Sequence, residues 1–460
     1  MLNVVQAFDR APIAEVATDD AAALERKLQA AQRVFKDRDG WLAAHQRMAI
    51  LRRLAGLMEA RRDHLALQIA REGGKPLADA VVETTRAIDG VHNAADELRN
   101  LAGREIPMGL SAAAEQRWAF TTKEPIGVVA AISAFNHPLN LIVHQVAPAI
   151  AVGCPVIIKP AGSTPLSCLE FVAMVHEAGL PEPWCQSFLP EGNALAEALA
   201  TDARVAFLSF IGSARVGWSL HAKLAPGTRS ALEHGGLAPA IVDRSADLDR
   251  IIEPIVKGGY YHAGQVCVST QRIYVHTAIA DDFIQRLVAR VERLRTGDPT
   301  LQDTECGPLI LPREVDRVAE WIDEAVKAGA GLATGGTRLS ETTYAPTVLL
   351  DPPTDVRIST QEIFGPAVAV YRYSDLDEAI ARANALPVAF QASIFAQDID
   401  VALRAANRLD ASAVMINDPT AFRTDWMPFA GRHQSGYGTG GIPYTMRDMT
   451  QEKMILMRRS

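Results

Sequence analysis

The chain of 460 residues lacks long hydrophobic runs, since no stretch reaches the roughly 18 uncharged apolar residues that a membrane-spanning helix needs. It also lacks an excess of positive charge: 46 Lys and Arg residues stand against 54 Asp and Glu residues, a formal net charge of −8. A mildly acidic chain lacks the excess of positive charge that attracts nucleic acid or an anionic membrane, so we expect neither as a partner. The N-terminus has no apolar run flanked by basic residues, and we expect no signal peptide.

Cysteines are few and odd in number, and none shows the CxxC spacing. This pattern argues against a disulfide framework and against a zinc site, and we expect no bound metal. We predict a cytoplasmic protein, because a reducing compartment leaves a reactive thiol free. The five cysteines are Cys154, Cys168, Cys185, Cys267 and Cys306.

The pattern of apolar residues indicates two to three domains of the α/β class. Residues 20–105 have apolar residues at helical spacing. From residue 127 onward, short buried-strand patterns alternate with helical ones, which favours a parallel sheet covered on both faces. A second such alternation runs from about 240 to 415, and the tail TQEKMILMRRS is typical of one strand on a sheet edge or on another subunit.

Cys267 is the first candidate for chemistry, in the segment GGYYHAGQVCVSTQR between a Gly-rich turn and a strand-like run. The alternative is a buried structural cysteine, which is the usual state of a free cysteine. We interpret the other four cysteines as buried structural residues, because they lie on apolar patterns or lack catalytic neighbours in the sequence.

Glu233 and Asn136 each end a buried strand. Glu233 lies in SALEHGGLAPAIV, and its alternative is a solvated carboxylate. Asn136 lies in ISAFNHPLN before Pro138, and its alternative is the N-cap of the next helix. Both residues would reach the carboxyl-terminal edge of the sheet, where open α/β folds bind ligands.

Three further segments suggest a nucleotide site. Lys159 closes the strand PVIIK and could contact a ribose, although a charge there more often solvates a loop. The segment GSARVG (212–217) opens a helix whose N-terminus could hold a pyrophosphate. In QEIFGP (361–366), Glu362 could hold ribose hydroxyls and Phe364 could pack on a ring, the alternative being a capped loop.

These segments together resemble the aldehyde dehydrogenase superfamily, from about residue 20 to the C-terminus. The resemblance rests on LE-x-GG followed 34 residues after its Glu by the Cys of GQ-x-C, then on E-x-F-G-P. The matching segments are FNHPL, VIIKPAGSTPL, FLSFIGSARVG, LEHGG, GQVC, EIFGP and MPFAGRHQSG.

The resemblance implies an NAD- or NADP-dependent oxidation of an aldehyde to a carboxylic acid. Cys267 would be the nucleophile that forms a thiohemiacetal and then a thioester. Asn136 would stabilise the oxyanion, and Glu233 would activate the hydrolytic water. Implied cofactor contacts are Lys159 with the adenosine ribose, Gly212 and Ser213 with the pyrophosphate, and Glu362 and Phe364 at the nicotinamide end.

The implied architecture is an aldehyde dehydrogenase fold with three parts. A Rossmann-like nucleotide-binding domain would comprise 1–104 and 124–234, an α/β catalytic domain 235–440, and a small β oligomerisation element 105–123 and 441–460. A homodimer or homotetramer is expected. The family's N-terminal strands are expected to be shortened, because the chain starts close to its first helix.

Departures from the common pattern concern the substrate and the cofactor. His137, Asn140 and His144 share one helical face, and Arg423 stands where an aromatic residue is common. The loop around Arg423 resembles those of members acting on lactaldehyde, glyceraldehyde, phosphonoacetaldehyde or sulfolactaldehyde. We therefore expect these four residues to face a small polar or anionic aldehyde, unless Asp425 pairs with Arg423 and neutralises it while the histidines bond the helix or a neighbouring loop.

The sequence also departs from the common family pattern in the predicted cofactor site, because it lacks the ribose-binding Glu that commonly follows KPA. Gly162 and Ser163 stand in its place, so we expect NADP to be accepted.

The sequence leaves three alternative functions open. A general-purpose enzyme for apolar aldehydes would not use the polar face. A CoA-acylating enzyme would not need Glu233, and a non-catalytic paralogue should have lost Cys267, Asn136 or Glu233.

Overall fold

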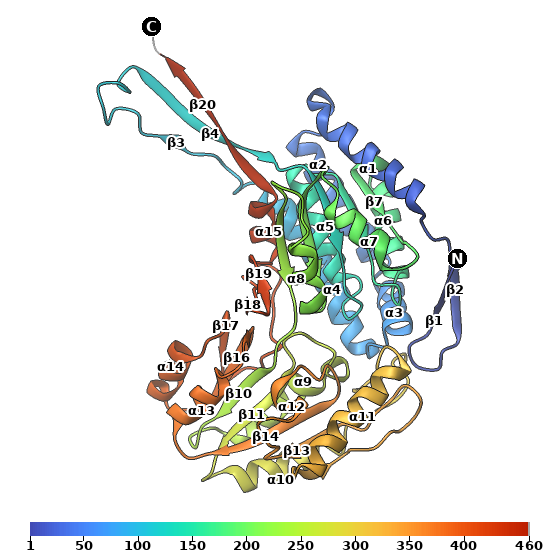
Figure 1. Cartoon of the computed structure of the whole chain (residues 1–460), viewed down its shortest axis with the longest axis vertical. Coiled ribbons are helices and arrows are strands. Elements are labelled where there is room, and N and C mark those ends of the chain that lie inside the picture. Colours follow the sequence, from blue (N-terminus) through green and yellow to red (C-terminus); the bar gives the residue numbers. More distant parts are fainter. Residues whose placement is uncertain (459–460) are drawn as a thin grey trace.

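The computed structural model describes residues 1–458, which form two α/β bodies and a projecting arm (Figure 1). The first body is built on a six-stranded sheet of order β19-β9-β8-β5-β6-β7, parallel except for β19. Its strands are β5 (Val128–Ile132), β6 (Val156–Lys159), β7 (Cys185–Ser187), β8 (Val205–Ile211), β9 (Arg229–Glu233) and β19 (Gly436–Tyr437).

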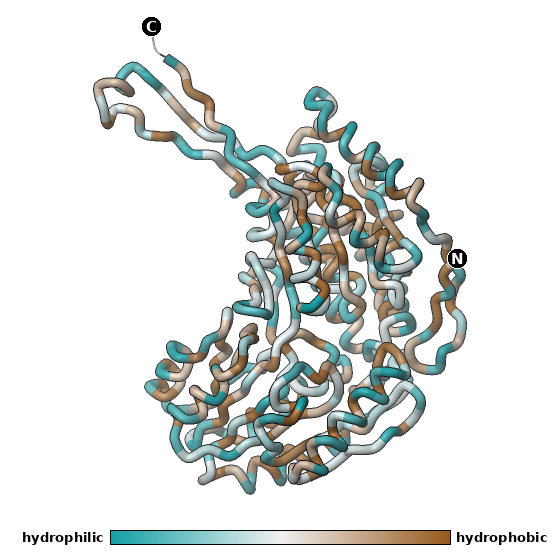
Figure 2. Tube along the Cα trace, in the orientation of Figure 1, coloured by the Kyte–Doolittle hydropathy of each residue, from teal (hydrophilic) through white to brown (hydrophobic). Residues whose placement is uncertain are grey.

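Helices cover both faces of this sheet. Along β5, Val129 and Ala131 pack on one side, while Val128, Ala130 and Ile132 pack on the other, as the two-residue period of a strand requires. The first side is covered by α2 (Ala44–Ala60), α3 (Arg62–Gly73), α4 (Leu77–Glu97), α5 (Asn140–Val152) and α6 (Leu166–Glu177). The second is covered by α1 (Ala21–Lys36), α7 (Asn193–Thr201) and α8 (Ala214–His221). In Figure 2 hydrophobic residues gather along the central elements, while the outer helix α1 alternates between hydrophilic and hydrophobic residues.

The second body holds a seven-stranded sheet of order β12-β13-β14-β11-β10-β16-β17, in which only the β12–β13 pair is antiparallel. The strands are β10 (Ala238–Val242), β11 (Thr270–His276), β12 (Gly331–Thr334), β13 (Thr347–Leu350), β14 (Ala367–Tyr373), β16 (Gln391–Phe395) and β17 (Ala413–Ile416). The helices are α9 (Leu248–Tyr260), α10 (Ala280–Val291), α11 (Pro312–Lys327), α12 (Arg357–Thr360), α13 (Leu376–Ala383) and α14 (Ile399–Arg408). Both parallel sheets confirm the α/β prediction.

The arm is an antiparallel sheet of order β20-β4-β3, which extends away from both bodies (Figure 1). It consists of β3 (Glu105–Ile106), β4 (Arg117–Pro125) and β20 (Thr450–Arg458). The strand predicted for the tail is confirmed over its described residues. Helix α15 (Ile442–Asp448) precedes β20 and packs into the first body, where Ile442 and Met446 join the core. The division into three domains at the residues given above stays a prediction.

The N-terminus differs from expectation. An antiparallel hairpin of β1 (Leu2–Val5) and β2 (Pro12–Val16) precedes α1 and was not predicted as such, while the prediction that these strands are shorter than is usual in the family stays a prediction. The sequence signal was weak because Val4 is the one residue of these two strands that is fully buried. The remaining short elements are η1 (Arg38–Gly40), η2 (Glu182–Trp184), η3 (Tyr261–Gly264), β15 (Val388–Ala389) and β18 (Arg432–His433). Over residues 1–458, no helix combines the length and the apolar character that crossing a bilayer demands.

Candidate active site

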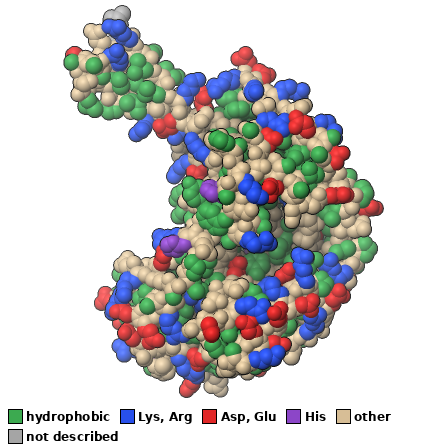
Figure 3. Space-filling view, viewed as in Figure 1, with side chains coloured by type: hydrophobic (Ala, Val, Ile, Leu, Met, Phe, Trp, Pro, Cys, Tyr) green, Lys and Arg blue, Asp and Glu red, His purple; other side chains and the backbone are tan. Residues whose placement is uncertain are grey.

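A cavity of about 790 Å³ is lined by residues of both bodies. Figure 3 shows the molecule hollowed between its upper and lower parts, with Lys and Arg side chains near the hollow. The cavity brings together residues that are far apart in the sequence. The predicted site residues that line it are Asn136, His137, Asn140, Lys159, Gly162, Ser163, Gly212, Ser213, Glu233, Cys267, Glu362, Phe364 and Arg423.

Cys267 reaches the cavity at the end of an unusual backbone segment. His262, Ala263 and Gly264 all have φ between 49° and 72°, in the left-handed region that L-residues rarely adopt. A Cβ on Gly264 would overlap the carbonyl oxygen of Gly365, so only glycine fits there. Burial raises the pKa of the Cys267 thiol to about 12, and the charge of Arg423 acts in the opposite direction. The other four cysteines are buried and do not line the cavity.

Asn136 lines the same cavity and contacts the segment that carries Cys267. It follows β5, is 4% exposed, and donates a hydrogen bond from Nδ2 to the carbonyl oxygen of Gln265, at 2.9 Å. The alternative that Asn136 caps the next helix is wrong, because α5 begins at Asn140.

A carboxylate from another helix caps α5 instead. Glu83 of α4 accepts from the backbone N–H groups of Leu139 and Asn140, at 3.0 and 3.1 Å, and forms a fully buried ion pair with Lys75. A cap from a distant helix has no local sequence signal. Glu83 was therefore not predicted from the sequence. Its position on the buried face of α4, where a charged residue needs a partner, was the one signal that could have indicated it.

Glu233 ends β9 and lines the same cavity. Burial raises the pKa of its carboxyl group, and the charge of Arg423 lowers it. A Cβ on Gly440 would overlap the Glu233 carboxylate, so a glycine leaves the room that this side chain occupies. The next residue, His234, donates from Nδ1 to the carbonyl oxygen of Gly212, at 2.9 Å, and ties this strand to the predicted pyrophosphate turn. Neither Gly440 nor His234 is among the site residues predicted from the sequence.

The predicted cofactor residues line the cavity between α7, α8 and the second body. Lys159 ends β6, and its Nζ has no hydrogen-bond partner within residues 1–458; burial lowers its pKa. No atom lies within 4 Å of the position of a Cβ on Gly162, so space is open beside it. Gly212 and Ser213 immediately precede α8, where free N–H groups favour an anion.

Glu362 and Phe364 approach from the loop before β14. Glu362 accepts from the N–H of Gly236 at 3.2 Å, and burial raises the pKa of its carboxyl group to about 8. Phe364 has φ 44° and meets Phe135 edge to face, with ring centroids 5.9 Å apart. An unpaired lysine, open space and a helix N-terminus in one cavity fit a dinucleotide with its phosphates.

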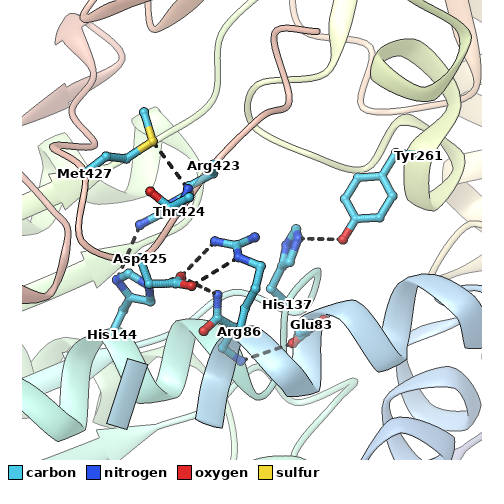
Figure 4. A network of polar contacts seen from close by, with 10 residues as sticks. Glu83, Arg86, His137, His144, Tyr261, Arg423, Thr424, Asp425 and Met427 are labelled. Carbon is cyan, nitrogen blue, oxygen red and sulfur yellow. Dashed lines mark hydrogen bonds and ion pairs between the residues drawn. The ribbon is translucent and has the colours of Figure 1, made fainter. Parts of the chain in front are cut away.

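The predicted substrate residues are only partly free. Asn140 Nδ2 and His144 Nε2 both donate to Asp425, at 3.1 and 2.7 Å, and His144 does not line the cavity (Figure 4). The predicted contact of His144 with a substrate is therefore wrong, whereas Asn140 lines the cavity, its Oδ1 has no partner within residues 1–458, and its contact with a substrate stays a prediction. His137 Nε2 lies 3.3 Å from the Tyr261 hydroxyl, and burial lowers its pKa well below its usual value.

Arg423 lines the cavity together with Arg86, Asn140 and Phe429, and we call this part of the cavity the Arg423 wall. Its guanidinium carbon is 3.4 Å from the centroid of the Phe429 ring, and its Nε is buried with no partner. The expected alternative, an ion pair with Asp425, does not form. Asp425 instead binds Arg86 of α4 through two hydrogen bonds, at 2.8 and 3.2 Å. No group of three metal-ligating side chains occurs within residues 1–458.

Two α/β bodies that share one cavity, lined by a cysteine and by residues that fit a dinucleotide, are typical of a dinucleotide-dependent dehydrogenase. The chain matches the aldehyde dehydrogenase family over residues 1–455 and belongs to that family. It is 35% identical over 457 residues to the 3-sulfolactaldehyde dehydrogenase of Priestia aryabhattai, covering 99% of this chain and 94% of the relative.

Two solved structures are similar over nearly their whole length. Aldehyde dehydrogenase 21 from Physcomitrella patens, in complex with the reaction product succinate, has 36% identity and a TM-score of 0.96, covering 99% of this chain and 95% of that one. The glyceraldehyde-3-phosphate dehydrogenase of Methanocaldococcus jannaschii, complexed with NADP, has 31% identity and a TM-score of 0.95, covering 100% and 99%. The predicted aldehyde dehydrogenase fold and an NAD(P)-dependent oxidation of aldehydes are confirmed.

Proposed function

We propose that this enzyme oxidises a small anionic aldehyde, and that Arg423 binds the negative group of the substrate. The observation that carries the proposal is that Arg423 lines the cavity with Cys267 and Glu233 but forms no ion pair within residues 1–458. A buried cation without a partner is costly, and an anionic ligand would remove that cost. The relative's name, sulfolactaldehyde dehydrogenase, and the succinate bound by the plant enzyme point the same way.

The charges around Arg423 support an anion over a neutral polyhydroxy substrate. Arg86 also lines the cavity, but Asp425 neutralises it. His144 stays neutral, since burial and the charge of Arg423 lower its pKa to about 4. Arg423 therefore carries the one positive charge of this wall that has no ion-pair partner within residues 1–458, and a carboxylate, sulfonate or phosphonate could match it in a bidentate manner.

We further propose that Cys267 is the nucleophile, Asn136 and the Cys267 N–H stabilise the oxyanion, and Glu233 activates the hydrolytic water. The bound dinucleotide would accept the hydride. Lys159, Gly162, Ser163, Gly212, Ser213, Glu362 and Phe364 would hold it. The presence of Glu233 disfavours a CoA-acylating enzyme, and the joint presence of Asn136, Glu233 and Cys267 in one cavity disfavours a non-catalytic paralogue.

The test compares 4-oxobutanoate with its neutral methyl ester. We call the ratio of kcat/KM for these two aldehydes the anion preference. Arg423→Ala should lower the anion preference by roughly 10- to 100-fold, the effect of losing charge-assisted hydrogen bonds worth about 1.5–3 kcal/mol. Steady-state kinetics at constant ionic strength measure it. Unchanged anion preference, or hexanal or benzaldehyde as the best substrates of the wild type, would refute the proposal.

For the cofactor we propose that NADP is accepted. A Glu beside the adenosine ribose would repel a 2′-phosphate, whereas the open space at Gly162 leaves room for it beside Lys159 and Ser163. Gly162→Glu should lower kcat/KM for NADP by about tenfold or more and change that for NAD far less. A wild-type preference for NAD of about a hundredfold would contradict this proposal.

We also propose a homodimer or homotetramer in a reducing, cytoplasmic environment. The arm supports the first part, because it exposes large apolar side chains far from either core: Trp118, Met454, Ile455, Leu456 and Met457. The second part is supported by Cys267, which acts only as a free thiol.

A further inference from the structure

Asp425 is the hub of a buried hydrogen-bond network on the Arg423 wall (Figure 4). Its carboxylate is 2% exposed and accepts from side chains of two helices: Arg86 of α4, and Asn140 and His144 of α5. Burial alone would raise the pKa of Asp425, but the hydrogen bond from His144 and the charge of Arg86 hold it well below its usual range. Asp425 is therefore a permanently charged carboxylate, and it orients the three side chains that donate hydrogen bonds to it.

The chemistry of its neighbours determines the tautomer of His144. A carboxylate only accepts hydrogen bonds, so Nε2 of His144, 2.7 Å from Asp425, carries the proton. A guanidinium only donates, and Nη2 of Arg423 faces the other ring nitrogen, Nδ1, at 3.4 Å. A neutral imidazole protonated at Nε2 satisfies both sides at once. Asp425 thereby presents a lone pair of His144 to Arg423.

No other polar group holds the Arg423 guanidinium within the described part of the chain. Its Nε has no partner, and its second contact is the face of the Phe429 ring, which fixes the plane of the group but not its rotation within that plane. The hydrogen bond to His144 supplies that missing restraint.

We propose that Asp425 and His144 are positioning residues: Asp425 locks His144 in the Nε2-protonated form, and His144 orients Arg423 toward the anionic group of the substrate. This proposal rests on the proposed function, because it explains how the anion site is held in shape. Neither residue need touch the substrate.

A simpler role for Asp425 would be to neutralise Arg86. The two roles predict opposite signs for Asp425→Asn. If Asp425 is only a counter-charge, its removal makes the wall more positive and increases the anion preference. If Asp425 acts through His144, its removal frees the ring to rotate, Arg423 loses its orientation, and the anion preference falls.

The experiment measures the anion preference in Asp425→Asn, His144→Gln and the double variant. Glutamine keeps a donor for Asp425 but offers no acceptor at the position of Nδ1, so it removes only the contact with Arg423. Asp418→Asn is the matched control, because it removes a carboxylate from the same loop that forms no hydrogen bond or ion pair within residues 1–458. Melting temperatures show that each variant is folded.

We expect each single variant to lower the anion preference by about tenfold, chiefly through KM for 4-oxobutanoate. The double variant should be no worse than either single one, because both changes break the same chain of contacts. Asp418→Asn should leave the anion preference unchanged.

An unchanged or increased anion preference in Asp425→Asn, or additive effects in the double variant, would overturn the proposal. If Asp425→Asn does not fold, an unchanged anion preference in His144→Gln overturns it alone. The Arg423→Ala result separates the two hypotheses. If that variant loses the anion preference while His144→Gln and Asp425→Asn keep it, the anion site stands and only the positioning role fails.

Discussion

Cys267→Ala is expected to abolish aldehyde oxidation, with kcat reduced by on the order of 10⁴- to 10⁶-fold, as in other covalent catalysts that lose their nucleophile. The physical reason is that alanine cannot form the thiohemiacetal from which hydride leaves. Cys267 is the one cysteine that lines the cavity within residues 1–458, so no other thiol can replace it. Formation of NADPH or NADH at 340 nm measures the loss.

The cofactor should still bind to this variant, because its predicted contacts lie on β6, α8 and the Glu362 loop. Fluorescence titration with NADP or NAD tests that separately from turnover. Cys185→Ala is the matched control, since Cys185 is buried in an outer strand of the first sheet and should leave kcat near the wild-type value. A Cys267→Ala enzyme with near wild-type kcat would show that the nucleophile is misassigned.

Glu233→Gln is expected to stall after hydride transfer and to lower kcat by roughly 10²- to 10⁴-fold, the usual contribution of a general base. The variant should produce a burst of about one NAD(P)H per active site followed by slow turnover. Burial raises the pKa of Glu233, so the wild-type carboxylate becomes a stronger base but is protonated, and inactive, at pH values below that pKa. Wild-type deacylation should accelerate as the pH rises through this range, and the variant should lose that dependence.

Hydroxylamine separates loss of the water-activating base from loss of the thiol-activating base. It attacks a thioester without a general base, so it should restore turnover of Glu233→Gln and yield the hydroxamic acid. Rescue with a burst supports the deacylation role. A variant with no burst and no rescue would show instead that Glu233 acts before hydride transfer.

Much of the fold is predictable because it follows from local patterns. The buried runs at β5, β6 and β8 show the composition of doubly covered strands, and their alternation with helices implies parallel sheets. The N-terminal hairpin was missed because the pattern there is weak: Val4 is the one fully buried residue of its two strands.

The candidate site likewise contains residues that local sequence patterns predict and residues that they do not. Glu233 ends β9, Asn136 follows β5 and Cys267 lies in the loop between η3 and β11, and their segments and spacing are specific enough to predict them from the chain alone. Glu233 and Asn136 reach the cavity because the carboxyl ends of β9 and β5 lie at the same edge of the first sheet, whereas Cys267 reaches it from the second body. The helix cap was not predictable in this way, because the carboxylate that supplies it, Glu83, comes from α4 more than 50 residues earlier.

The sequence by itself therefore determined the class of fold, the family's motifs with the residues predicted for catalysis, and the presence of an arginine at position 423, because these depend on composition, period and order along the chain. Only the tertiary structure decided whether that arginine is free. Asp425 is two residues from Arg423 but pairs with Arg86 and His144, which are 339 and 281 residues away. A buried carboxylate binds the donors that packing brings to it, and helices α4 and α5 bring theirs closer than the chain brings Arg423.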